Sequence, residues 1–203
     1  MPRKQRRVLS RTVRRGELIA AAVNVFSHKG YRRASISDII AAAGVARGTF
    51  YLYFQSKEEI FRAIIEDFHE VIRRRLDQVG EIPHFGTDAR ESLLVGFMGW
   101  LQTFADNRQA ARIVLREASA IDARFESGYA ALRRSAIGAL TRRVRQVQDL
   151  GLARTVPPQV VAIVELGMLE EAVRTLVLDD PAPDLAALAE ALVDLHWSGL
   201  RPD

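Results

Sequence analysis

Residues 35–57, SISDIIAAAGVARGTFYLYFQSK, have the spacing of a helix-turn-helix. Ser35 begins a helix, and Asp38 stands three residues later as the return partner of a capping box. Gly44 follows the alanine-rich end of this helix, where a tight turn needs a residue that tolerates positive φ. We therefore predict a second helix that runs from about Ala46 to Phe54.

The second helix has a buried side and an exposed side. Val45, Phe50 and Phe54 fall on one side at helical spacing. The other side carries an arginine suited to a guanine edge, small residues for close approach and tyrosine hydroxyls suited to phosphates. Each of these residues alone also fits a turn or half-buried packing, so the prediction of DNA binding depends on their joint spacing. The residues on this side are Arg47, Gly48, Thr49, Tyr51 and Tyr53.

This pattern resembles the DNA-binding domain of TetR-family transcriptional regulators. The matching features are the Ser-started helix, its alanine-rich end, Gly-Val at the turn, Gly-Thr-Phe-Tyr-x-Tyr-Phe, and then Ser-Lys-Glu-Glu. The resemblance is strong over about residues 15–65 and weak beyond them. It implies that Arg47 reads a base edge. It implies close approach to DNA at Ala46, Gly48 and Thr49, and phosphate contacts from Ser35, Ser37, Tyr51, Tyr53 and Lys57.

Charge is divided unevenly along the chain. Residues 1–57 hold twelve Lys and Arg against two acids, whereas residues 58–203 hold 17 basic and 23 acidic groups. A basic head joined to a mildly acidic body is typical of a nucleic-acid-binding domain attached to a separate domain. Residues 1–11 form a dense basic arm. Such an arm either follows phosphates or the minor groove, or is only a solvated tail.

The chain after residue 57 has the apolar periodicity of helices, with glycine and proline between them. The expected helices cover about 57–79, 87–105, 107–120, 124–150, 158–178 and 184–199. We predict an all-α protein of about nine helices, with a three-helix DNA-binding domain before a helical bundle. Its parts are a flexible basic arm over 1–11, the helix-turn-helix domain over 12–56, and a ligand-binding and dimerisation domain over 57–203.

Several other classes of protein have little support in the sequence. The chain has no cysteine, no apolar run of the roughly 18 residues that a membrane helix needs, and no secretory signal. It has no nucleotide-binding glycine loop and no nucleophile elbow. Glu66 and His69 have the Glu-x-x-His spacing of di-iron bundles, but the second such motif is missing. We expect a cytoplasmic protein that is not an enzyme and has no metal or cofactor.

The resemblance implies that the C-terminal bundle pairs with a second copy and encloses a small-molecule effector. Pairing in this family usually uses the last two long helices, although the same residues can instead close the core of one chain. The candidates on the first of these helices are Val160, Ile163, Val164, Gly167, Met168, Glu171 and Val173. Those on the second are Leu185, Leu188, Leu192, Leu195 and Trp197.

An aromatic face near the middle of the chain is the candidate effector site. Aromatic walls with a few polar groups are typical of a ligand cleft, although such a stripe also suits a core. The candidate ligand-binding residues are Phe97, Trp100, Leu101, Phe104, Arg112 and Arg116. Burying the two arginines without a partner is costly, so an apolar ligand with a carboxylate or phosphate, such as an acyl chain, fits them.

The sequence thus predicts a homodimeric transcriptional regulator, with a repressor as the role that the resemblance implies. It would bind a near-palindromic double-stranded operator and release it when a small apolar effector binds. An activator role depends on the position of the promoter and stays open. The alternative is an architectural DNA-binding protein without an effector, which the long basic arm favours.

Overall fold

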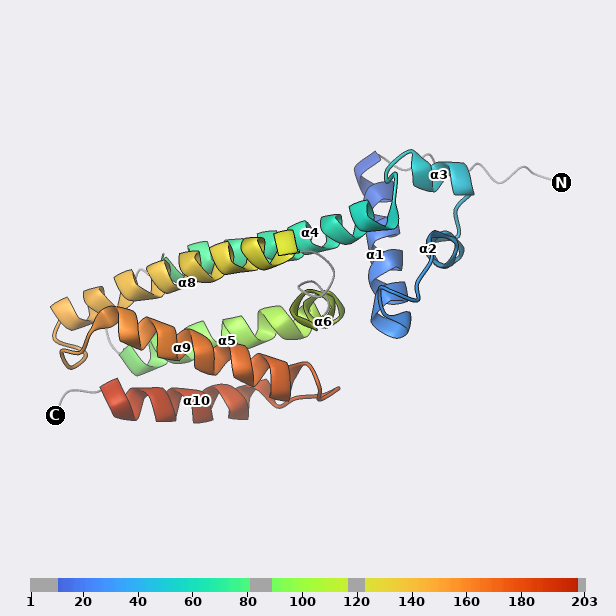
Figure 1. Cartoon of the computed structure of the whole chain (residues 1–203). Coiled ribbons are helices and arrows are strands. Elements are labelled where there is room, and N and C mark those ends of the chain that lie inside the picture. Colours follow the sequence, from blue (N-terminus) through green and yellow to red (C-terminus); the bar gives the residue numbers. More distant parts are fainter. Residues whose placement is uncertain (1–10, 81–88, 117–122, 201–203) are drawn as a thin grey trace. The chain divides into compact units, whose positions relative to one another are not determined.

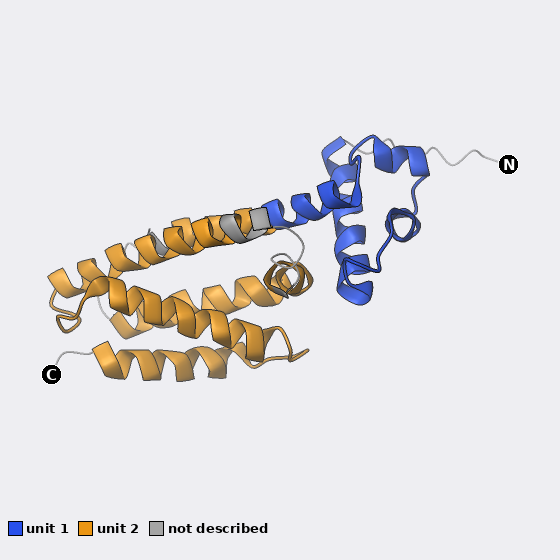
Figure 2. Cartoon of the chain, viewed as in Figure 1, with its two compact units in different colours: residues 1–67 blue, residues 68–203 orange. Residues whose placement is uncertain are grey.

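The computed structural model describes residues 11–80, 89–116 and 123–200, and every regular element in these ranges is a helix (Figure 1). The predicted all-α class is confirmed. The chain divides into two compact units, residues 1–67 and 68–203 (Figure 2). The division falls within helix α4 (Lys57–Gly80), so the first turns of α4 belong to the N-terminal unit. None of the described helices is long and apolar enough to cross a membrane.

The N-terminal unit is built from three helices and the start of α4. They are α1 (Arg11–Lys29), α2 (Ile36–Ala43) and α3 (Arg47–Tyr51). Its core contains an aromatic cluster in which the ring centroids of Phe26 and Tyr31 lie 5.5 Å apart, and those of Tyr31 and Phe61 4.5 Å apart. Phe26 and Phe61 are fully buried, so the start of α4 is packed into the same core as α1. This core fixes the positions of α2 and α3.

Local signals in the sequence define the ends of α2. The side chain of Ser35 accepts a hydrogen bond from the backbone N–H of Asp38, and the Asp38 carboxylate accepts one from that of Ser35. The predicted capping box is therefore confirmed. Gly44 has φ of +62°, which only glycine adopts without strain. The next helix, α3, is shorter than predicted, because residues 52–53 form a turn rather than continuing it.

The C-terminal unit consists of the rest of α4 and the helices that follow it in the chain. They are α5 (Ala89–Asp106), α6 (Arg108–Arg116), α8 (Ala123–Asp149), α9 (Pro158–Ala172), the π-helix η1 (Val173–Val177) and α10 (Leu185–Leu200). Within this unit α8 packs along α9, and α10 packs along α5 (Figure 1). The unit buries Phe97, Leu101 and Ile113 almost completely, and this apolar core holds the helices together.

Two boundaries of the C-terminal unit differ from the sequence-based prediction. The helix expected over 158–178 is α-helical only to Ala172 and then widens into η1. The N–H of Leu178 bonds to the carbonyl of Val173, five residues earlier, at 2.9 Å. Such π segments are rare and often occur at functional sites. The helix expected over 107–120 is described only to Arg116, and the first two residues of the helix expected over 87–105 lie outside the described residues.

Candidate DNA-binding surface and ligand pocket

The start of α3 is the most exposed part of the helix-turn-helix. Ala46, Arg47 and Gly48 are exposed, and a Cβ placed on Gly48 would have no atom within 4 Å. The Arg47 guanidinium lies 5.8 Å from the centre of the Tyr51 ring, a cation–π distance. Thr49 and Tyr51 are half-buried. The surface therefore offers a cationic side chain beside positions where a duplex meets little steric resistance.

The start of α2 is exposed and has an ordered polar network. Ser35 and Ser37 are both exposed, as the predicted phosphate contacts require. The Ser35 hydroxyl donates to the Asp38 carboxylate at 2.8 Å and, as the helix cap, accepts from the Asp38 N–H at 3.2 Å. The Lys29 ammonium donates to the same carboxylate at 2.6 Å, and this bond with those from Ser35 lowers the pKa of Asp38 to about 2. The network fixes the start of α2 against the end of α1.

Lys57 has a structural role that the sequence did not reveal. Its ammonium donates to the carbonyls of Tyr31 and Ala34, at 2.9 and 3.0 Å, and lies 4.3 Å from the centre of the Tyr31 ring. Burial and the hydrogen bond to Glu58 raise the pKa of Tyr31 to about 12. The family resemblance implied a phosphate contact for Lys57, and a cation in the first turn of a helix is unfavourable unless something binds it. Its contacts with the two carbonyls also explain that placement.

Two aromatic or apolar neighbours complete this surface. Tyr53 is half-buried, whereas Leu52 has 71% of its surface exposed. Leu52 was not among the predicted surface residues, because the helix was expected to continue to Phe54. The turn after Tyr51 brings the Leu52 side chain outward instead.

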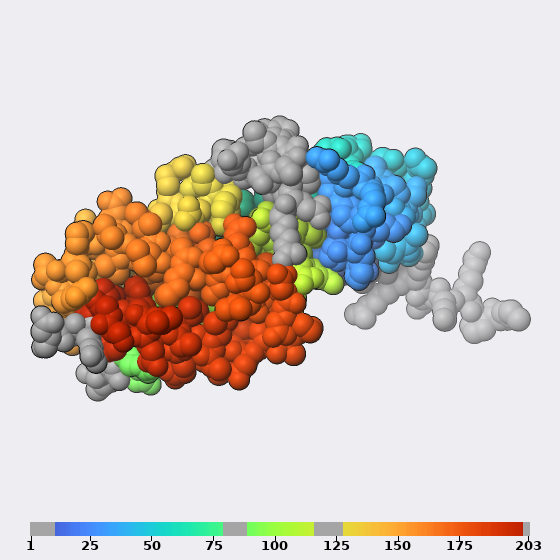
Figure 3. Space-filling model, turned by 60° about the horizontal axis from the view of Figure 1, so that its bottom comes forward, coloured from blue at the N-terminus to red at the C-terminus, as the bar shows by residue number. Residues whose placement is uncertain are grey.

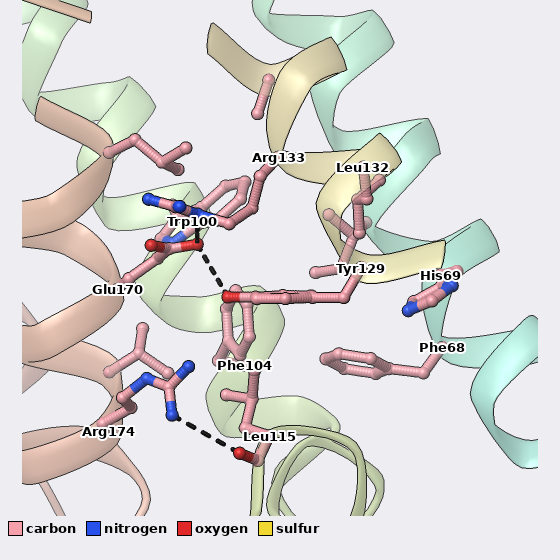
Figure 4. Close-up of a pocket in the computed structure, with 14 residues that line it drawn as sticks. Phe68, His69, Trp100, Phe104, Leu115, Tyr129, Leu132, Arg133, Glu170 and Arg174 are labelled. Atoms are coloured by element: carbon pink, nitrogen blue, oxygen red, sulfur yellow. Dashed lines mark hydrogen bonds and ion pairs between the residues drawn. The ribbon is translucent and has the colours of Figure 1, made fainter. Parts of the chain in front are cut away.

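The C-terminal unit contains a pocket formed by α4, α5, α6, α8, α9 and η1 (Figure 4). It holds about 470 Å³ of empty space when its open mouth is counted. Much of its wall is aromatic or aliphatic, including Phe68 and Ile72 of α4, Trp100 and Phe104 of α5, and Leu132 of α8. The Trp100 and Phe104 ring centroids lie 5.3 Å apart. An aromatic and aliphatic lining of this kind suits a small apolar ligand.

One side of the pocket carries a compact charged group. The Glu170 carboxylate accepts hydrogen bonds from the Tyr129 hydroxyl at 2.7 Å and from Arg133 at 3.0 Å (Figure 4). Burial, with the contact to Glu170, raises the pKa of Tyr129 to about 12, so this hydroxyl keeps its proton. Arg174 donates to the carbonyl of Leu115 at 3.4 Å. Two arginines against one carboxylate leave this group with an excess of positive charge.

Two further polar atoms of the pocket walls are buried. His69 Nε2 and Trp100 Nε1 have no hydrogen-bond partner among the described residues. Burial lowers the pKa of His69, and Arg73 lowers it further, so the ring is neutral at pH 7. His69, which the sequence singled out only for its Glu-x-x-His spacing, lies in the pocket wall. A ligand with a hydrogen-bonding group would satisfy these atoms.

The predicted ligand-binding residues are distributed among several places. Trp100 and Phe104 line the pocket, whereas Phe97 lines a neighbouring hollow. Leu101 is fully buried and lines neither space. Arg112 is outside the pocket: it donates to the carbonyl of Leu178 and lies 3.8 Å from Asp179. The side chain of Arg116 lies outside the described residues.

The polar half of the pocket was not predicted from the sequence. Arg133, Glu170 and Arg174 come from α8, α9 and η1, so no local spacing in the sequence brings them together. The mixed composition of these helices gives no signal beyond an amphipathic pattern. In the described ranges, no group of three or more His, Asp or Glu residues is placed to hold a metal ion.

These features define a protein with an N-terminal helix-turn-helix and a C-terminal helical domain that contains a pocket. Comparisons with known proteins indicate the family that it resembles. Residues 18–64 match the family described as bacterial regulatory proteins, tetR family. The uncharacterized HTH-type transcriptional regulator YdgC of Bacillus subtilis (strain 168) is 48% identical over 60 residues, which cover 30% of this chain and 31% of YdgC. This similarity is therefore confined to about a third of each protein.

Two comparisons extend over most of the chain. The fatty acid metabolism regulator protein of Bacillus subtilis (strain 168) is 28% identical over 195 residues, covering 91% of this chain and 94% of that protein. The crystal structure of the transcriptional regulator FadR from Bacillus subtilis in complex with stearoyl-CoA has a TM-score of 0.70 and 25% identity, over 91% of this chain and 98% of that one. Residues 18–64 are thus a DNA-binding domain of the tetR family, and the chain as a whole is similar to transcriptional regulators of that family.

Proposed function

We propose that this protein is a homodimeric repressor that binds a near-palindromic operator and releases it when an apolar, anionic effector fills the pocket. The observation that carries the proposal is the aromatic pocket with two arginines against one carboxylate, in a chain of this family. Exposed Arg47 at the start of α3 would read a base edge. Ser35, Ser37, Tyr51 and Tyr53 would contact phosphates, with a smaller contribution from Lys57 because its ammonium also binds two carbonyls.

An exposed apolar face supports pairing with a second copy. Val160, Ile163 and Val164 of α9 have 56%, 46% and 57% of their surfaces exposed, and Leu195 of α10 has 72%. Figure 3 shows α9 in orange and α10 in red side by side on one face of the C-terminal unit. Gly167 on α9 has no atom within 4 Å of an added Cβ, so another helix can approach closely there. Exposed apolar patches of this kind mark interaction sites.

The chemistry of the pocket indicates the class of effector. Its apolar walls suit a hydrocarbon chain, and Arg174 beside the neutralised Arg133–Glu170 pair suits an anionic group. A relative with a similar fold has been crystallised with stearoyl-CoA, which combines a long chain with phosphates. We propose an acyl-CoA or a similar amphipathic anion as the effector.

Helix α4 provides a route by which the effector can alter DNA binding. Phe68, His69 and Ile72 of α4 line the pocket, while the first turn of the same helix holds Lys57 against two carbonyls of the N-terminal unit. A ligand can shift an equilibrium only through its different affinity for the two states. We infer that the ligand favours a position of α4 in which the two heads of the dimer no longer match the operator.

The proposal is tested by selecting duplexes that bind the chain from a random library. We expect an inverted repeat, bound by two chains, and loss of the selected motif in Arg47→Ala. Placing the repeat over a promoter should lower transcription in a purified system, and adding stearoyl-CoA should restore it. Selection of no motif would favour the architectural alternative, and increased transcription from such promoters would identify an activator.

A further inference from the structure

Two further hollows accompany the ligand pocket among the described residues of the C-terminal unit. The first of them, which we call the middle hollow, is lined by residues that include Leu76 of α4, Phe97 of α5 and Leu140 of α8. The other, the end hollow, is lined by residues that include Leu93 of α5 and Val147 of α8. All three lie between helices of the same unit, so their order along those helices can be compared directly.

The lining residues follow the same order on each helix. On α5, Phe104 lines the ligand pocket, Phe97 the middle hollow and Leu93 the end hollow. On α8, the corresponding residues are Leu132, Leu140 and Val147. Since these helices run alongside the hollows, the three spaces lie in series along the unit.

Two side chains separate the ligand pocket from the middle hollow. Trp100 and Leu166 line both spaces and are only 7% and 2% exposed. Beyond them, Arg143 and Glu165 line both the middle and the end hollow, with Arg143 Nη1 3.8 Å from Glu165 Oε1. The first partition is therefore apolar, and the second is a buried ion pair.

The charged group of the ligand pocket gives a bound amphiphile its direction. Arg174 lies two helical turns along α9 and η1 from Leu166, a separation of about 12 Å at 1.5 Å per residue. An anionic group bound at Arg174 leaves the hydrocarbon chain free to run along Phe104 and Tyr129 toward Trp100. The end of the chain then meets the apolar partition.

We infer that Trp100 and Leu166 form the end wall that sets the longest hydrocarbon chain the pocket accepts. The inference rests on the proposed function only in requiring an amphipathic ligand with a linear chain. Chains that end before the wall gain affinity with every methylene that they bury. Longer chains must bend or leave carbons outside, and they gain no more. Opening the wall adds the middle hollow, so longer chains regain affinity until the Arg143–Glu165 pair stops them.

The test measures binding of straight-chain saturated acyl-CoA thioesters, from octanoyl to stearoyl, by calorimetry on the full-length protein without DNA. The wild-type affinity should rise about fourfold per methylene, the ratio that matches about 0.8 kcal/mol per buried CH₂. It should then stop rising at one chain length. In Trp100→Leu and in Leu166→Ala, this limit should move to chains that are several carbons longer.

Leu101→Ala is the matched control, because Leu101 is fully buried beside Trp100 and lines none of the three hollows. It should lower the melting temperature as Leu166→Ala does but keep the wild-type limit. An unchanged limit in both wall variants, or a limit that moves equally in Leu101→Ala, would overturn the inference. A moved limit without release of DNA would support the wall and contradict the proposed effector function. Absence of acyl-CoA binding would overturn both.

Discussion

Arg47 is the residue on which sequence reading by this protein should depend. It is exposed at the first position of α3, and its neighbours Ala46 and Gly48 are too small to keep a duplex away. Arg47→Ala should weaken binding to the selected operator by about 1–3 kcal/mol and relax the preference at one base position. Arg62→Ala, an exposed arginine on α4, is the control. Competition titrations that show equal losses on operator and random DNA for Arg47→Ala would contradict this role.

Asp38 links the cap of α2 to the end of α1 and should make stability dependent on pH. Its pKa falls to about 2 from an ordinary value of 3.8, mainly because Lys29 and Ser35 bond to the carboxylate. A group whose pKa is lower in the folded state contributes stability that is present above about pH 4 and lost as the pH falls through about 2.

The difference in unfolding free energy between the wild type and Asp38→Asn should therefore shrink as the pH falls from 4 to 2. Denaturant titrations at several pH values would measure it. Lys29→Met should remove much of the same dependence, because the ammonium is the first cause of the lowered pKa. A difference that stays constant over this range would show that Asp38 does not act through its charge.

At the scale of elements, α9 and α10 combine a buried face with an exposed apolar one. Val164→Glu should break the proposed dimer, because it places a charge among Val160, Ile163 and Gly167 on the exposed side of α9. Val95→Glu is the matched control, since Val95 is a similarly exposed valine, on α5, with 62% of its surface accessible. Sedimentation should show a monomer only for Val164→Glu. Dissociation by the control alone would place the interface elsewhere.

The helices of the N-terminal unit were predictable because the residues that fix their ends are close together in the sequence. Ser35 with Asp38 fixes the start of α2, and Gly44 fixes its end. The C-terminal end of α3 was less predictable. Apolar Phe54 suggested that the helix continues to it, but Phe54 is also buried after the turn that ends α3. The phosphate role of Lys57 was inferred from the family resemblance and the helix dipole, whereas contacts with Tyr31 and Ala34, more than 20 residues away, occupy its ammonium.

The ligand pocket was only partly predictable because it depends on tertiary packing. The apolar face of α5 was recognised, but a periodic pattern cannot distinguish a residue that faces a hollow from one that faces solid core. Trp100 and Leu101 are adjacent in the chain and both buried, yet only Trp100 lines the pocket. Glu170 and Arg174 are joined to α8 through Tyr129 and Arg133, and η1 alters the helical spacing around Arg174.

At the scale of the whole molecule, positive and negative charge are concentrated in different parts of the chain. Positive charge is concentrated in residues 1–57, and residues 58–203 carry a net negative charge. Residues 1–10 lie outside the described part of the structure, and their sequence includes Arg3, Lys4, Arg6 and Arg7. Segments that bind phosphates without a fixed register add affinity and little specificity.

Deletion of residues 2–11 removes Arg3, Lys4, Arg6, Arg7 and Arg11. Binding to any duplex should fall steeply at moderate salt, and the slope of log affinity against log salt should decrease. The ratio of operator to random affinity should change little. Titrations of both duplexes over a range of salt concentrations would measure these quantities, and a collapse of the ratio would show that the arm reads a groove.

The proposal depends most on one effect: a ligand bound in the pocket of the C-terminal unit lowers the affinity of the helix-turn-helix for DNA. The most direct measurement is a titration of the labelled operator with the full-length protein, with and without saturating stearoyl-CoA, followed by fluorescence anisotropy. We predict that the ligand weakens operator binding by roughly five- to 150-fold, the range of a coupling of about 1–3 kcal/mol. Coenzyme A alone should have little effect. Operator affinity that is unchanged while the pocket is shown to be occupied would contradict the claim.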